Sequence, residues 1–306
     1  MPPVISVKNL TKRYGRTNAV NDVSFHVSKG ETFGLLGENG AGKTTTLEII
    51  EGLRRPSAGR VTVLGHDTAR GINSIKEKIG VQLQSSAYYN FLTLNEILAF
   101  FCSLYKNCLN PKDLLGLVEL SDKANSYVSN LSGGQRQRFS IIASLVNDPE
   151  IVFLDEPTTG LDPLARRNLW KLISEIKSRG KTIILTTHYM EEAELLCDRV
   201  AIMEKGRILA MDETHKLIAR AKNPYKISFI SPKVNKEVFK RFVALGEIEN
   251  TFGKVNQFEL KICTQPNLNR ALQLVNKLNP ESLTVGRARL EDIFIELTGK
   301  TIADEE

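Results

Sequence analysis

A glycine-rich stretch near the N-terminus reads Gly37-Glu38-Asn39-Gly40-Ala41-Gly42-Lys43-Thr44, and Thr45 follows it. The stretch fits the pattern G-x-x-x-x-G-K-[ST], in which glycines let backbone N–H groups converge on phosphate oxygens without a clash from Cβ atoms. It comes after a short apolar segment, residues 31–36, and opens residues 42–51, for which we expect a helix. We therefore predict a strand, a phosphate-binding loop and a helix whose N-terminus adds partial positive charge.

The last residues of this stretch carry its side-chain chemistry. Lys43 would reach the β- and γ-phosphates of a nucleotide, and the Thr44 hydroxyl would ligate Mg²⁺. We take residues 37–45 as a candidate nucleotide cradle. A glycine-rich turn with an incidental lysine is the alternative, but the strand before it and the helix after it favour the cradle.

A second candidate site begins where an apolar run meets two acids, at Ile151-Val152-Phe153-Leu154-Asp155-Glu156. Ligands of open parallel sheets bind beyond the carboxyl ends of the strands, so Asp155 is expected beside the cradle, where it can hold Mg²⁺ directly or through water. Glu156 could orient or deprotonate an attacking water. Taken alone this pattern is weak, because apolar strands followed by Asp-Glu are common.

The length and composition suggest two ordinary folded domains. The chain has 306 residues and a net charge of +6. Its composition, 42% hydrophobic and 25% charged, excludes a disordered chain and collagen-like repeats. Strands and helices alternate up to about residue 220, which predicts an α/β domain with a mostly parallel sheet over residues 1–222. Residues 223–306 follow a β-α-β-β-α-β order, which suggests a small α+β, ferredoxin-like domain.

The cysteines and the apolar segments indicate the cellular compartment in which the protein works. Cys102, Cys108, Cys197 and Cys263 show no C-x-x-C spacing, so we expect four free thiols in a reducing environment. The N-terminus has no secretory signal and no apolar stretch is long enough to span a bilayer. We therefore expect a cytoplasmic protein.

The stretch Leu131-Ser132-Gly133-Gly134-Gln135 points to a family. Over about residues 4–220 the chain resembles the ATP-binding subunits of ABC transporters, and the other family motifs occur in the family order. They are the adenine-stacking aromatic, the Q-loop glutamine, the D-loop and the switch histidine, which match Tyr14, Gln84, Leu161-Asp162 and His188. The resemblance implies a P-loop NTPase core, an antiparallel β subdomain and a helical subdomain at about residues 88–146. Glu38 departs from the proline that many relatives have there.

The resemblance also implies roles for these residues. Gln84 would join Thr44 and Asp155 at Mg²⁺, and would act with Glu156 and His188 in ATP hydrolysis. His188 would hold the γ-phosphate, and Asp162 would couple two sites. Ser132, Gly133, Gly134 and Gln135 of one copy would cap the ATP held by the other copy, which implies a homodimer with ATP sandwiched at its interface.

The C-terminal segment indicates a particular subfamily of these ATPases. Residues 290–299 resemble the terminal motif of daunorubicin-resistance and nodulation-type ATPases, which drive export of drugs, lipids or polysaccharides. This implies a separate integral membrane permease, docked near Gln84 and residues 85–92, and a place on the cytoplasmic face of the membrane. No nucleic acid is expected as a partner.

Two other functions stay open at this point. One is a soluble ATP switch with the same fold that is not coupled to transport. The other is a regulatory module that binds ATP without turnover, against which the presence of Glu156 and His188 argues.

Overall fold

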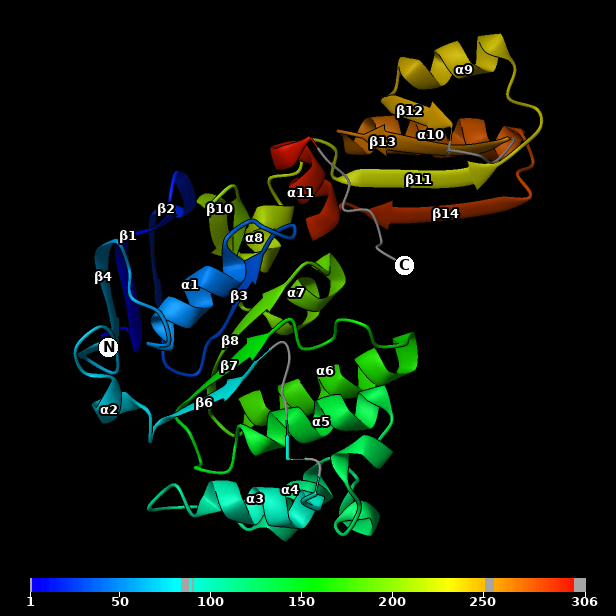
Figure 1. Ribbon diagram of the computed structural model, residues 1–306. Coiled ribbons are helices and arrows are strands. Elements are labelled where there is room, and N and C mark those ends of the chain that lie inside the picture. Colours follow the sequence, from blue (N-terminus) through cyan, green and yellow to red (C-terminus); the bar gives the residue numbers. More distant parts are fainter. Residues whose placement is uncertain (1, 84–87, 90, 251–255, 300–306) are drawn as a thin grey trace. The chain divides into compact units, whose positions relative to one another are not determined.

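The computed structural model describes residues 2–83, 88–89, 91–250 and 256–299 (Figure 1). The chain divides into two compact units, one up to Asp212 and one that begins at Glu213.

The first unit contains a six-stranded sheet in the order β10-β9-β3-β8-β7-β6. Its strands are β3 Thr32–Leu36, β6 Ile79–Gln82, β7 Ile151–Asp155, β8 Thr182–Thr187, β9 Arg199–Glu204 and β10 Arg207–Glu213. The pairs β6–β7, β7–β8, β8–β3 and β3–β9 are parallel. Every residue of β3, β7 and β8 is buried, as expected for parallel strands covered on both faces. The predicted mostly parallel sheet is confirmed.

A second sheet packs against the first. It has the order β2-β1-β4-β5, and it is formed by β1 Ile5–Tyr14, β2 Thr17–Val27, β4 Ala58–Val63 and β5 His66–Asp67. Its pairs are antiparallel. One hydrophobic core joins the two sheets, with Phe25 of β2 stacked on Phe33 of β3 at a ring-centroid distance of 4.9 Å.

The helices of this unit are α1 Lys43–Ile50, α2 Ile72–Ile75, α3 Leu94–Cys102, α4 Pro111–Leu117, α5 Gly133–Ala143, α6 Pro163–Ser178 and α7 Met190–Leu196. Short 3₁₀ turns cover Ser121–Lys123 and Val128–Asn130. Helix α1 contacts β7 and β8, whereas α3, α4 and α5 contact one another and form the helical region. In the described part of the chain, none of the helices has the length and apolar character needed to cross a membrane.

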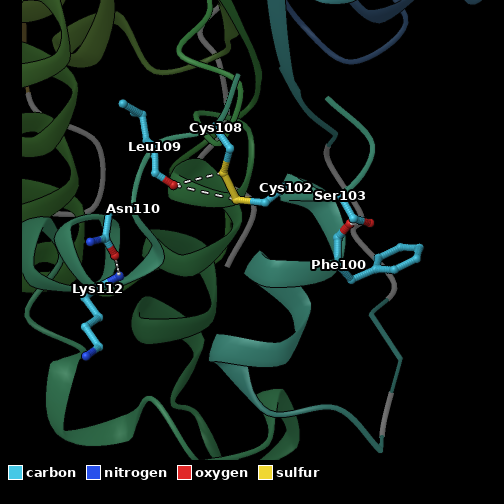
Figure 2. Close-up of a disulfide and its surroundings, with 7 residues drawn as sticks. All are labelled: Phe100, Cys102, Ser103, Cys108, Leu109, Asn110 and Lys112. Atoms are coloured by element: carbon cyan, nitrogen blue, oxygen red, sulfur yellow. Dashed lines mark hydrogen bonds between the residues drawn. A yellow bond between two sulfur atoms is a disulfide. The ribbon is translucent and has the colours of Figure 1, made fainter. Parts of the chain in front are cut away.

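The cysteines of the helical region correct one prediction. Cys102 and Cys108 are joined in a disulfide, with their Cα atoms 5.3 Å apart, and both sulfur atoms face the carbonyl oxygen of Leu109 (Figure 2). The expectation of four free thiols was therefore wrong for this pair. Helix α3 ends at Cys102 and the chain turns back at once, which brings Cys108 within the usual Cα separation of a disulfide. Cys197, which is buried, and Cys263, which is exposed, form no disulfide within the described residues.

The second unit contains α8 Thr214–Ile218, β11 Tyr225–Ile230, α9 Lys236–Val243, β12 Glu247–Asn250, β13 Gln257–Ile262, α10 Gln265–Lys277, β14 Ser282–Arg287 and α11 Leu290–Thr298. Its antiparallel sheet has the order β12-β13-β11-β14. Phe229, Leu260 and Phe242 are central to a core shared by the sheet with α9 and α10. The predicted β-α-β-β-α-β order is confirmed.

Candidate functional site

The glycine-rich loop connects the end of β3 to the start of α1 (Figure 1). Gly42 stands directly before α1 with φ at +100°, and a Cβ atom there would lie 2.4 Å from the carbonyl oxygen of Ala19. A side chain at this position is therefore excluded both by the backbone conformation and by the close approach of β2. Gly40 also has a positive φ, +80°. The loop thus needs glycine where the motif has it.

Lys43, the first residue of α1, turns its side chain back into this loop. Its Nζ atom donates hydrogen bonds to the carbonyl oxygens of Gly37 (2.8 Å) and Glu38 (3.1 Å). The same atom lies 3.1 Å from Oε1 of Glu156, and the Lys43 side chain is only 4% exposed. The ammonium group is therefore held where a bound phosphate could take over its contacts.

Asp155, the last residue of β7, lies beside the cradle. Its Oδ1 atom accepts hydrogen bonds from the hydroxyl of Thr44 at 3.3 Å and from the hydroxyl of Thr186 at 2.5 Å. Burial raises the pKa of Asp155, and the neighbouring Glu156 adds to the rise, while the Thr186 and Thr44 hydroxyls oppose it. Asp155 therefore lies next to Thr44 of the cradle, as the sequence predicts.

These two residues suit Mg²⁺. A carboxylate and a hydroxyl are hard oxygen donors, and Oγ1 of Thr44 and Oδ1 of Asp155 lie close enough to ligate one ion. No cluster of three or more metal-ligating His, Cys, Asp or Glu side chains occurs among the described residues. An ion here would therefore rely on few protein ligands together with substrate phosphates, which is the usual arrangement for Mg²⁺.

Glu156 follows Asp155 in a left-handed backbone conformation, with φ at +46°. Its backbone N–H donates to the side-chain oxygen of Thr186 at 2.9 Å, which helps to hold this uncommon conformation. Its carboxylate accepts a hydrogen bond from Thr159 at 3.2 Å and lies 3.4 Å from Nδ1 of His188. Glu156 therefore contacts both Lys43 of α1 and the partly exposed His188, and the three side chains form one cluster beside the carboxyl ends of β7 and β8.

The electrostatics of Glu156 follow from these neighbours. Contact with His188 lowers its pKa most strongly, and Lys43 lowers it further, to about 2 despite the opposing effect of burial. The carboxylate is thus fully ionised at neutral pH.

The stretch from Ser132 to Gln135 forms the start of α5. Ser132 caps the helix by accepting a hydrogen bond from the Gln135 backbone at 3.3 Å, and the Gln135 side chain accepts one from the Ser132 backbone at 3.0 Å. Next to it lies a cavity of about 480 Å³, lined by Ser132, Gly133, Gly134, Gln135, Arg138, Gly160, Leu161, Asp162, Leu164, Ala165 and Asn168. The structure therefore brings the predicted signature residues and Asp162 to one pocket.

Asp162 also has a local role. Its Oδ1 atom caps α6, accepting hydrogen bonds from the backbone N–H groups of Leu164 and Ala165, both at 2.9 Å. A role in coupling two sites stays a prediction.

Tyr14 ends β1 with its side chain 41% exposed. Nζ of Lys12 lies 5.2 Å from the ring centroid and Cζ of Arg54 lies 5.4 Å from it. The ring is thus accessible to a ligand, and two cationic side chains lie within cation–π distance of it. Gln84, the predicted Q-loop glutamine, lies outside the described residues.

Sequence reasoning missed Thr186 and Thr159. Thr186 bonds to both acids of the site, and Thr159 bonds to Glu156. A hydroxyl residue at the end of a buried strand next to the acid-bearing strand is a signal that could have identified Thr186.

Residues 20–159 match the family model described as ABC transporter. The chain is 33% identical over 313 residues to the linearmycin resistance ATP-binding protein LnrL of Bacillus subtilis (strain 168), covering 98% of this chain and 100% of that protein. It is 36% identical over 319 residues to the Nod factor export ATP-binding protein I of Burkholderia orbicola (strain AU 1054), covering 98% of each.

A solved structure is similar as well. It is a dimeric ATP-binding cassette in a post-hydrolysis state bound to ADP and Pi, with a TM-score of 0.62 and 27% identity, covering 68% of this chain and 98% of that one. The chain belongs to the ATP-binding subunits of the ABC transporter family. The domain that defines this family binds ATP and ADP.

Proposed function

We propose that this protein hydrolyses ATP to energise export through a separate membrane permease, with two copies closing around ATP and Mg²⁺. The cluster beside the glycine-rich loop, in which Glu156 contacts both Lys43 and His188, supports this most strongly. In this cluster the carboxylate proposed to act on water contacts both a cation that can bind phosphate and a histidine.

The residues around the cradle have separable tasks. Backbone N–H groups of residues 37–45 and the α1 N-terminus would bind the phosphates, and Tyr14 would stack on adenine. Thr44 and Asp155, with Gln84, would hold Mg²⁺, which neutralises phosphate charge when bound.

Glu156 would accept a proton from the attacking water. The water oxygen would then bond to the γ-phosphorus as the bond to the β,γ-bridging oxygen breaks, giving ADP and phosphate. His188 would hold the γ-phosphate. Because Lys43 is now paired with Glu156, a phosphate that draws Lys43 away would raise the pKa of Glu156 toward its usual range and make it a better base.

The pocket lined by Ser132, Gly134 and Asp162 is open on this chain. We assign it to the ATP held by a second copy, because a helix N-terminus offers N–H groups to an anion. The dimeric cassette bound to ADP and Pi supports an assembly of this kind. ATP would favour the closed dimer by its differential affinity for that state.

Export rests on the tail motif and on relatives named for Nod factor export and linearmycin resistance. A drug, lipid or polysaccharide is the proposed class of cargo. Exposed apolar side chains support permease docking near the Q-loop, since Leu83 is 44%, Tyr89 64% and Phe91 89% exposed. Such docking would place the protein at the cytoplasmic face of a membrane.

The test uses the purified chain and its permease. ATP turnover should fall at least about 10²-fold in Glu156→Gln, since a positioned general base contributes on that scale. Copurification with an integral membrane protein distinguishes transport from a soluble ATP switch. Turnover unchanged by Glu156→Gln would contradict the assigned chemistry.

A further inference from the structure

Glu192 of α7 is a buried carboxyl group that has no part in the chemistry proposed above. Its side chain is 0% exposed, so it does not reach a bound nucleotide. Burial raises the pKa of Glu192, and a carboxyl group buried this completely is costly unless other polar groups hold it. The groups that oppose the rise are the side chains of Thr187, Thr158 and Trp170 and the charge of Arg166.

One of these neighbours belongs to the segment that carries His188. Thr187 is the last residue of β8 and directly precedes His188. Its hydroxyl oxygen accepts a hydrogen bond from the backbone N–H of Tyr189 at 2.9 Å, and the rings of His188 and Tyr189 lie 4.1 Å apart. Residues 187–189, the His188 segment, therefore form a tight unit with Glu192 against its first residue.

The other neighbours belong to a second segment, residues 158–170, which we call the Asp162 segment. Thr158 is fully buried and lies shortly before Asp162. Nε1 of Trp170, on α6, donates a buried hydrogen bond of 3.2 Å to Oε1 of Glu192. Asp162 caps the same helix. The carboxyl group of Glu192 thus lies between the His188 segment and the Asp162 segment.

A second contact joins the same two segments. Cζ of Arg166 lies 4.0 Å from the centroid of the Tyr189 ring. Arg166 is one helical turn after Asp162, and its backbone N–H donates to the carbonyl oxygen of Asp162 at 2.9 Å. Polar contacts of this kind are stronger in the low dielectric of the interior than at the surface, and they favour one fixed arrangement.

We infer that Glu192 is a positioning residue, which holds the His188 segment against the Asp162 segment. It acts on ATP turnover through the placement of His188, without contact with the nucleotide. The inference rests on the proposed role of His188 in ATP hydrolysis. Misplacing a reacting group by about 1 Å can cost about 10²-fold in rate, so a buried contact of this kind can matter for turnover.

The first test replaces Glu192 by leucine, which fills similar space and accepts no hydrogen bond. For Glu192→Leu we expect kcat to fall by roughly tenfold or more. The KM for ATP should stay unchanged, because the cradle of residues 37–45 is unaltered. A kcat equal to that of the unaltered protein, or a loss that appears only in KM, would overturn the inference.

Glu192→Gln is the conservative variant. It keeps an oxygen that can accept the hydrogen bond from Trp170, and burial already disfavours the charged form of Glu192. We therefore expect Glu192→Gln to retain most of the turnover that Glu192→Leu loses. Equal losses in the two variants would show that the hydrogen bond is not the cause, and would contradict the positioning role.

Glu31 offers a matched control for the loss of a buried carboxyl group. It lies directly before β3, at the other end of the parallel strands from the cradle, and it pairs with Arg199 at 3.0 Å. Glu31→Leu should leave kcat unchanged, with circular dichroism showing that the variants are folded. A fall in kcat as large as that of Glu192→Leu would show a general loss of stability, and the inference would be wrong.

A double substitution tests whether Glu192 acts through His188. In a His188→Ala protein, adding Glu192→Leu should lower the residual turnover no further. The same fold reduction in both backgrounds would overturn the inference. Turnover unchanged by His188→Ala alone would contradict the proposed function and this inference with it, whereas reduced turnover there together with an unchanged Glu192→Leu protein would contradict this inference alone.

Trp170→Phe examines the same contact from its other end. It removes the N–H donor and keeps an aromatic ring, so we expect a lower kcat at unchanged KM. This variant decides the question even if Glu192→Leu does not fold, because an unaltered kcat in Trp170→Phe would overturn the inference.

Discussion

Nζ of Lys43 lies 3.1 Å from Oε1 of Glu156, and both side chains are buried. The lysine of the phosphate-binding loop is thus the direct partner of the candidate base. Phosphate binding and the pKa of Glu156 are therefore coupled. When Lys43 contacts a bound phosphate, it can no longer lower the pKa of Glu156 to the same extent.

The pair can be measured in the absence of nucleotide. Lys43→Ala should lower the free energy of unfolding by about 3 kcal/mol, because it removes the lysine partner of a buried carboxylate, which keeps its contacts with His188 and Thr159. Lys43→Ala combined with Glu156→Gln should be less destabilised than the sum of the two single changes. Denaturant unfolding of all four proteins at pH 8 gives the coupling energy, and additive effects would contradict the pairing.

Thr186 links the two acids through one side-chain oxygen. Thr186→Val should lower the free energy of unfolding by about 2 kcal/mol and reduce ATP turnover. The reason is that the Asp155 carboxylate and the Glu156 backbone N–H both lose their hydrogen bond to the Thr186 hydroxyl. Thr186→Val should also raise the pKa of Asp155 further, since the Thr186 hydrogen bond lowers that pKa. The acid limb of the turnover profile should therefore move to higher pH.

Thr186→Ser is the matched control, because it keeps the hydroxyl and removes only a methyl group. We expect its profile to resemble that of the unaltered protein. A profile for Thr186→Val that coincides with that of Thr186→Ser would show that the hydroxyl is not needed.

Glu51, which follows α1, is 2% exposed, and burial raises its pKa to about 8, aided by Asp155 and Glu48. The folded protein therefore holds a proton that the unfolded chain releases above its ordinary pKa of 4.5. The resulting stability is complete below pH 4.5 and is lost as the pH rises toward 8. Between pH 5 and pH 8 the loss amounts to about 4 kcal/mol.

Glu51→Gln keeps the shape of the side chain and cannot ionise. Its stability should fall less between pH 5 and pH 8 than that of the unaltered protein. Thermal unfolding at the two pH values measures the difference, and parallel losses in both proteins would rule out Glu51 as the cause.

Asp162 caps α6 and lines the pocket beside Ser132. Asp162→Ala should cost about 1 kcal/mol of unfolding free energy through loss of the cap. Asp162→Asn retains the capping oxygen and should keep that stability. If Asp162→Asn nevertheless lowers ATP turnover, the carboxylate acts beyond capping, whereas full turnover would assign it to capping alone.

The sequence allowed prediction of those features that depend on one continuous stretch. The glycine loop, the acids after β7 and the helix that opens at residues 132–135 each combine a local conformation with a short motif, so spacing was enough. The order of elements after residue 223 followed from periodicity in the same way.

Features that depend on the meeting of separate stretches were less accessible. Thr186 acts on Asp155 because β8 lies beside β7, and strand order is not visible in either segment alone. The Cys102–Cys108 disulfide depends on how tightly the chain turns after α3, and spacing gave no sign of it.

The nucleotide retained by Glu156→Gln tests the central claim most directly. After incubation with ATP and Mg²⁺ and removal of free nucleotide, we expect this variant to elute as a dimer that holds uncleaved ATP. Adding Lys43→Ala should abolish the retained ATP, because the phosphates lose their buried cation. Equal nucleotide content in the two variants, or ADP in place of ATP in Glu156→Gln, would contradict the roles given to Lys43 and Glu156.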